Sequence, residues 1–92
     1  MKVTILTFCL FAFLLAFSTQ TFAVDFTVNL TTDQSDSSAA DGACDTDLAS
    51  AGSQCTLRAA FEQAINLAGN DRVLFNLPAN STITLTDGEI QL

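Results

Sequence analysis

The chain contains no histidine, tryptophan or tyrosine, one proline, and three lysine or arginine residues among its 92. Without histidine, catalysis by a histidine acid or base and metal sites with histidine ligands are excluded. Ten Asp and Glu residues give a formal net charge of −7, whereas a nucleic-acid-binding surface needs a basic stripe that displaces counterions. The composition therefore excludes a nucleic-acid partner, and the length allows one small domain.

The N-terminal residues are typical of a secretory signal peptide. Met1-Lys2 gives a positively charged start, residues 3–17 form an uncharged and mostly apolar run, and Thr21-Phe22-Ala23 ends the segment. Small residues three and one before a cut after Ala23 fit signal cleavage. The run is shorter than the ~20 apolar residues that span a bilayer. We therefore predict a signal peptide over residues 1–23, a secreted, cell-surface or outer-membrane location, and membrane contact only during export. An uncleaved membrane anchor is the alternative.

Two cysteines remain once the signal peptide is removed, Cys44 and Cys55, because Cys9 lies in the apolar run. Exported proteins meet an oxidising compartment in which such cysteines pair. We therefore predict a structural disulfide between Cys44 and Cys55. The loop that it closes would contribute roughly 3 kcal/mol of stability in the chain-entropy estimate.

The first part of residues 24–92 predicts a strand followed by a loop. Residues 25–31 alternate between apolar and polar side chains, with Phe26, Val28 and Leu30 on one face. This alternation indicates a half-buried strand. Residues 32–54 are rich in Asp, Ser, Ala and Gly and contain almost no large apolar side chain, which is typical of a long loop.

A helix is predicted over residues 57–68, with Thr56 as its N-cap and Gly69 or Asn70 as the left-handed residue that ends it. Six apolar side chains recur at helical spacing and define one face: Leu57, Ala60, Phe61, Ala64, Ile65 and Ala68. The opposite face is expected to be solvated: Arg58, Glu62, Gln63 and Asn66. Arg58 and Glu62 are four residues apart, a spacing that allows an ion pair on this face.

After the helix the apolar period falls to two, which predicts three further strands. The first begins at Val73, the second covers residues 82–86, and the third covers residues 89–92 after an Asp87-Gly88 turn. Arg72 at the start of the first strand is expected to be a surface charge. The predicted fold class is therefore mostly β with one short α-helix.

Residues 55–66, with the sequence CTLRAAFEQAIN, resemble the motif of the CSLREA domain. The likeness extends over about residues 24–92, although Ala59 stands where the family name has Glu, and Ile65 stands where Ala is common. The resemblance implies the N-terminal cap and first coil of a right-handed parallel β-helix in a secreted or surface protein. The β-helix body that follows in the family is missing from this sequence, so we expect a truncated form.

The expected function is structural, without catalysis and without a cofactor. The first coil of a β-helix exposes apolar side chains and unpaired strand edges, and an amphipathic helix can cover them. The expected partners are the downstream β-helix coils, and through them a carbohydrate or cell-surface ligand. One alternative is the cap of a polysaccharide lyase or hydrolase whose chemistry lies downstream. Another is a small secreted domain that binds its ligand in a calcium-dependent way.

The calcium alternative depends on an acidic stretch between residues 33 and 47 that contains five Asp residues. Oxygen-rich loops bind Ca²⁺, which is available outside cells. The candidate ligands are Asp41, Asp45 and Asp47, whose spacing does not follow the ligand order of an EF-hand. The other interpretation is that these Asp side chains stabilise turns of a soluble loop.

Overall fold

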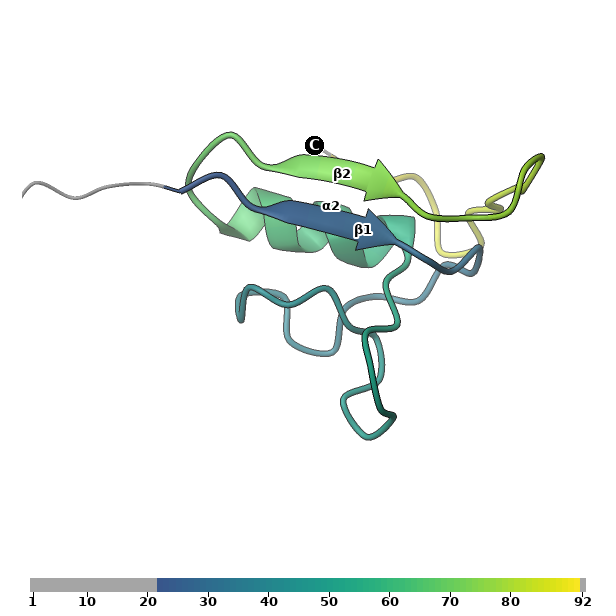
Figure 1. Ribbon diagram of the computed structural model, residues 1–92, viewed down its shortest axis with the longest axis horizontal. Helices are drawn as coiled ribbons and strands as arrows, with labels where there is room; N and C mark the ends of the chain where they lie inside the picture. Colours follow the sequence, from purple (N-terminus) through teal and green to yellow (C-terminus); the bar gives the residue numbers. More distant parts are fainter. Residues whose placement is uncertain (1–21, 92) are drawn as a thin grey trace, which may run out of the picture.

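The computed structural model describes residues 22–91, so nearly all of the predicted signal peptide lies outside the described residues. Within this range the elements are strand β1 (Asp25–Val28), helix α2 (Leu57–Asn66) and strand β2 (Arg72–Phe75). The two strands pair in parallel, and α2 lies behind them (Figure 1). No helix of the described residues is both long enough and apolar enough to cross a membrane.

The strand pair buries one face against the helix. Phe26 and Val28 of β1 are 3% and 0% exposed, whereas the alternating residues of β1 are exposed. Phe26 lies beside Val73, and Val28 lies beside Phe75. The predicted alternation is therefore present in β1, although the strand ends three residues earlier than expected because the chain then turns toward Cys55.

Helix α2 begins where the sequence predicts and ends earlier. The Thr56 hydroxyl accepts a hydrogen bond from the Ala59 amide at 3.0 Å, which is the expected N-cap. The last helical residue is Asn66, and the residue after it is extended. Gly69 has the left-handed φ of 124°, and a Cβ there would lie 2.7 Å from the Phe22 carbonyl oxygen. Glycine is therefore required at this position for both its φ and the close approach of the chain.

The buried face of α2 is rotated from the predicted one. Its buried residues are Ala59, Ala60 and Gln63, whereas Ile65 is 55% exposed. The short alanine side chains let the helix approach the strand pair and the disulfide closely, and Gln63 is buried because its amide is hydrogen-bonded. The core of the described residues is small: Phe26, Val28, Cys44, Cys55, Ala59 and Ala60.

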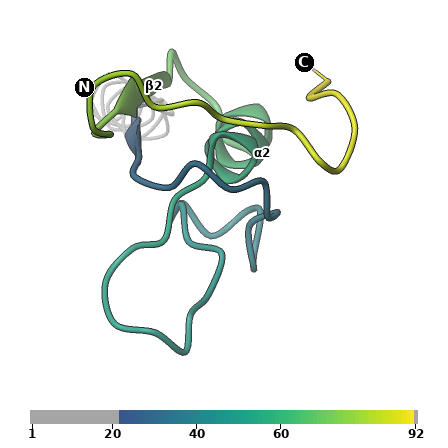
Figure 2. The same cartoon turned by 90° about the vertical axis from the view of Figure 1, so that its right-hand side faces the viewer.

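The last part of the described chain, residues 76–91, contains no strand. The strand predicted over residues 82–86 is wrong, as is the described part of the one over 89–92; Leu92 lies outside the described residues. The segment runs across the N-terminal end of α2 (Figure 2). Alternation indicates which face of an extended chain is apolar, but a strand also needs a neighbour with which its backbone can pair.

Candidate functional site

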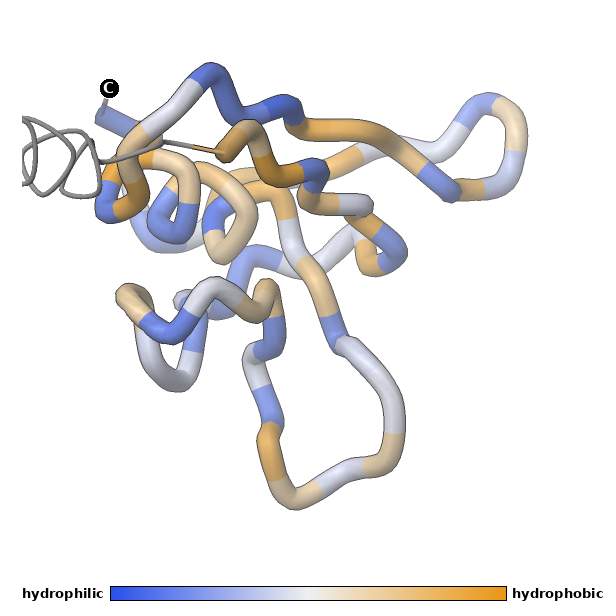
Figure 3. Tube along the Cα trace, turned by 60° about the vertical axis from the view of Figure 1, so that its left-hand side comes forward, coloured by the Kyte–Doolittle hydropathy of each residue, from blue (hydrophilic) through white to orange (hydrophobic). Residues whose placement is uncertain are grey.

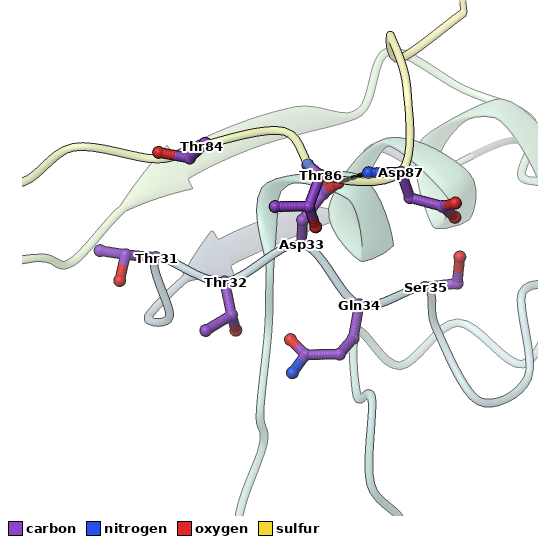
Figure 4. A pocket seen from close by; sticks show the side chains of 8 residues that line it. All are labelled: Thr31, Thr32, Asp33, Gln34, Ser35, Thr84, Thr86 and Asp87. Carbon is purple, nitrogen blue, oxygen red and sulfur yellow. Dashed lines mark hydrogen bonds between the residues drawn. The ribbon is translucent and has the colours of Figure 1, made fainter.

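A polar hollow of about 610 Å³ lies between the loop that follows β1 and the C-terminal segment. Figure 4 shows the side chains around it, which come from residues 31–35 and from Thr84, Thr86 and Asp87. Asp33, in the first of these segments, is 7% exposed, whereas the other lining residues are exposed. One buried carboxylate therefore lies in the wall of the hollow.

The buried carboxylate of Asp33 is paired with Arg58 of α2. Arg58 donates from Nε to Asp33 Oδ1 and from Nη2 to Asp33 Oδ2, each at 3.0 Å. The side chains of Arg58 and Asp33 are 11% and 1% exposed. The predicted solvated pair between Arg58 and Glu62 is wrong, because Asp33 offers a two-bond geometry that fits the planar guanidinium better.

The same ion pair holds the C-terminal segment. The amides of Thr86 and Asp87 both donate to Asp33 Oδ2 at 2.8 Å. Arg58 Nη2 also donates to the carbonyl oxygen of Gly88 at 2.6 Å. One ion pair therefore joins three parts of the chain, namely the loop after β1, the helix and residues 86–88.

The ion pair keeps both groups charged at neutral pH. Hydrogen bonds from Arg58 lower the pKa of Asp33, and this effect outweighs desolvation, which acts in the opposite direction. The amides of Asp87 and Thr86 lower the same pKa further. The pKa of Arg58 is raised, first by its hydrogen bonds with Asp33. A carboxylate with both oxygens occupied by donors is suited to holding the chain in place rather than to transferring protons.

A second buried polar side chain of α2, Gln63, is fully buried and anchors the acidic loop. Its Nε2 donates to the Ser38 carbonyl at 2.8 Å and to Asp41 Oδ1 at 3.0 Å. Its Oε1 accepts from the Gly42 amide at 3.0 Å. The prediction that Gln63 faces water is therefore wrong, because the loop supplies a partner for each end of the amide group.

The disulfide between Cys44 and Cys55 is present, and both cysteines are buried. Asn29 links the end of β1 to this disulfide. Its amide donates to the Cys55 carbonyl at 2.9 Å, and its Oδ1 accepts from the Cys55 amide at 2.8 Å. Asn29 Nδ2 also donates to the Ser53 carbonyl at 2.6 Å. The sequence predicts Asn29 within the strand over residues 25–31, away from its apolar face, and gives no sign of this link to the disulfide.

The three candidate calcium ligands each stabilise a turn. The Oδ1 atoms of Asp41, Asp45 and Asp47 accept hydrogen bonds from the amides two residues further along the chain, at 3.0 to 3.1 Å. Such bonds define Asx turns. Within residues 22–91, no three His, Cys, Asp or Glu side chains form a group that could hold a metal ion.

Arg72 pairs with Asp25 across the two strands, through bonds of 2.8 and 2.7 Å. The side chains are 67% and 42% exposed, so Arg72 is the surface charge that the sequence predicts. Both arginines of the described residues are thus in ion pairs with aspartates.

No protein-family model, curated protein or solved structure matches this chain.

Proposed function

We propose that this chain is a structural N-terminal capping segment of an exported or cell-surface parallel β-helix protein, and that it carries no catalysis of its own. The observation that supports this most is the parallel pairing of β1 with β2 over four residue pairs. Stacked solenoid repeats contact only their neighbours, and a parallel pair of strands is the contact that successive β-helix coils share. The resemblance of residues 55–66 to the CSLREA motif supports the same proposal.

The distribution of apolar side chains also supports a capping role. Helix α2 covers one face of the strand pair, while several apolar side chains on the described surface stay uncovered. Leu74 is 39% exposed, Phe75 is 59% exposed and Leu85 is 41% exposed. Further protein that covered these side chains would remove their apolar surface from water, which is favourable. In the proposed role, the following coils supply that protein and carry any carbohydrate-binding or cell-surface-binding site.

The absence of catalysis is proposed from what the polar groups already do. Asp33 and Arg58, the most buried ionisable pair of the described residues, are engaged with each other and with backbone groups of residues 86–88. The Asp side chains of the acidic loop hold turns. These groups position the chain, so we assign them a structural role and no cofactor.

The mass of the native product in the exported fraction, measured without reducing agent, tests this proposal. We expect a product that begins at Val24 and is much larger than residues 24–92, because coils would follow the cap. Sequencing of its C-terminal part would then show whether acidic and basic residues gather in one groove of the coils, as in a polysaccharide-degrading enzyme. A product of residues 24–92 alone would contradict the capping role.

A further inference from the structure

The sequence contains two Asn-x-Ser/Thr sequons, the pattern at which exported proteins receive N-linked oligosaccharides. One begins at Asn29 and reads NLT, and the other begins at Asn80 and reads NST. A sequon is used only in a chain that enters the secretory pathway, as the N-terminal residues predict here. Both asparagines are exposed, so exposure alone does not distinguish them.

The side chain of Asn29 is engaged inside the molecule. Its Nδ2 donates to the Ser53 carbonyl at 2.6 Å, and its Oδ1 accepts from the Cys55 amide at 2.8 Å. These bonds join the end of β1 to the loop that the disulfide closes. A sugar on Nδ2 would replace one of its two hydrogens and bring a bulky group beside Ser53. The folded structure therefore disfavours a sugar on Asn29.

Asn80 lies in a projecting turn that does not depend on its side chain. The amide and the hydroxyl of Ser81 both donate to the Pro78 carbonyl, at 3.3 and 2.6 Å. Asn80 has a φ of 63°, a left-handed value that asparagine adopts more readily than most residues. In Figure 1 the chain that follows β2 extends past the ends of β1 and α2 before it turns back. A large group on this turn would therefore extend into solvent.

We propose that Asn80, and not Asn29, carries an N-linked oligosaccharide in the exported protein. The donor is an oligosaccharide on a polyprenyl diphosphate, used by a transferase of the secretory pathway. The Asn80 Nδ2 forms a bond to the anomeric carbon of the first sugar, while the bond from that carbon to the diphosphate oxygen breaks. The lipid diphosphate leaves with the electron pair, and the amide loses one proton. This inference rests on the predicted export and not on the capping role.

Mass spectrometry of peptides from the full-length gene product, collected from the exported fraction of the cells that make it, tests this proposal. We expect the peptide that contains residue 80 to carry an added mass. Peptide N-glycosidase should remove this mass and leave an aspartate at that position. The peptide that contains residue 29 should carry no sugar. An unmodified peptide at residue 80, or a sugar at residue 29, would overturn the proposal.

Matched threonine variants assign the added mass to one sequon. Thr82→Ala removes the hydroxyl that the sequon of Asn80 requires, so we expect the added mass to be lost completely, whereas Thr82→Ser should retain it. Thr31→Ala makes the same change in the sequon of Asn29, also at an exposed side chain, and should leave the added mass unchanged. An added mass that persists in Thr82→Ala, or that disappears in Thr31→Ala, would contradict the assignment to Asn80.

Discussion

The loop of residues 29–56 and the segment of residues 76–91 are both irregular, but they are attached to the rest of the molecule differently. The loop is bound at several places, by the disulfide, by Asn29 and by Gln63. Beyond the Asn76 amide, which donates to the Val28 carbonyl, the described C-terminal segment makes its polar contacts with distant residues at one place, where Asp33 and Arg58 hold residues 86–88. Hydrophilic and apolar residues are interspersed along both of them (Figure 3). An irregular backbone can thus be ordered by side chains without a hydrophobic interior of its own.

The comparison predicts that the largest loss of stability follows removal of the disulfide. In the double variant Cys44→Ser, Cys55→Ser we expect the free energy of unfolding in urea to fall by about 3 kcal/mol, because the unfolded chain is no longer cross-linked. Limited proteolysis should become faster within residues 32–54. An unchanged rate of cleavage there would show that the other anchors suffice to hold the loop.

A smaller loss is expected from Gln63→Leu. The substitution removes the hydrogen bonds of Gln63 to the Gly42 amide and the Ser38 carbonyl, and a hydrogen bond of this kind contributes about 0.5–1.5 kcal/mol. The exposed Gln91 provides the matched control, since Gln91→Leu makes the same change where the structure buries nothing. Equal unfolding midpoints for the two variants would argue against Gln63 as an anchor of the loop.

The sequence predicts the elements of this fold better than it predicts their polar contacts. Periodicity predicts β1, the start of α2 and β2, because the apolar side chains of each recur at a regular spacing within a few consecutive residues. The roles of Arg58 and Gln63 depend on partners more than 20 residues away, at Asp33 and at the loop around Asp41. Local pattern alone therefore placed both side chains in solvent. The strand predicted over residues 82–86 failed for a related reason, since a strand depends on a distant neighbour as well as on alternation.

The smallest effect on the whole molecule, and the most local one, is expected from acid. The pKa of Asp33 is lowered from 3.8 in the folded chain, so the unfolded chain takes up the proton first as the pH falls. The contribution of this carboxylate to the free energy of unfolding is therefore fully present above pH 3.8 and is lost as the pH falls through the lower pKa of the folded chain.

Hydrogen exchange at single amides measures this loss. Exchange of the Thr86 and Asp87 amides should accelerate in that pH range relative to their intrinsic rates. Exchange of the Gly42 amide, which is held by the uncharged Gln63, should not accelerate. In Asp33→Asn, which cannot titrate, exchange at residues 86 and 87 should already be fast at neutral pH and show no such acid step. If acid accelerated exchange equally at Gly42, the loop and the C-terminal segment would open together. The attachments of the loop and of the C-terminal segment would then differ in geometry but not in stability.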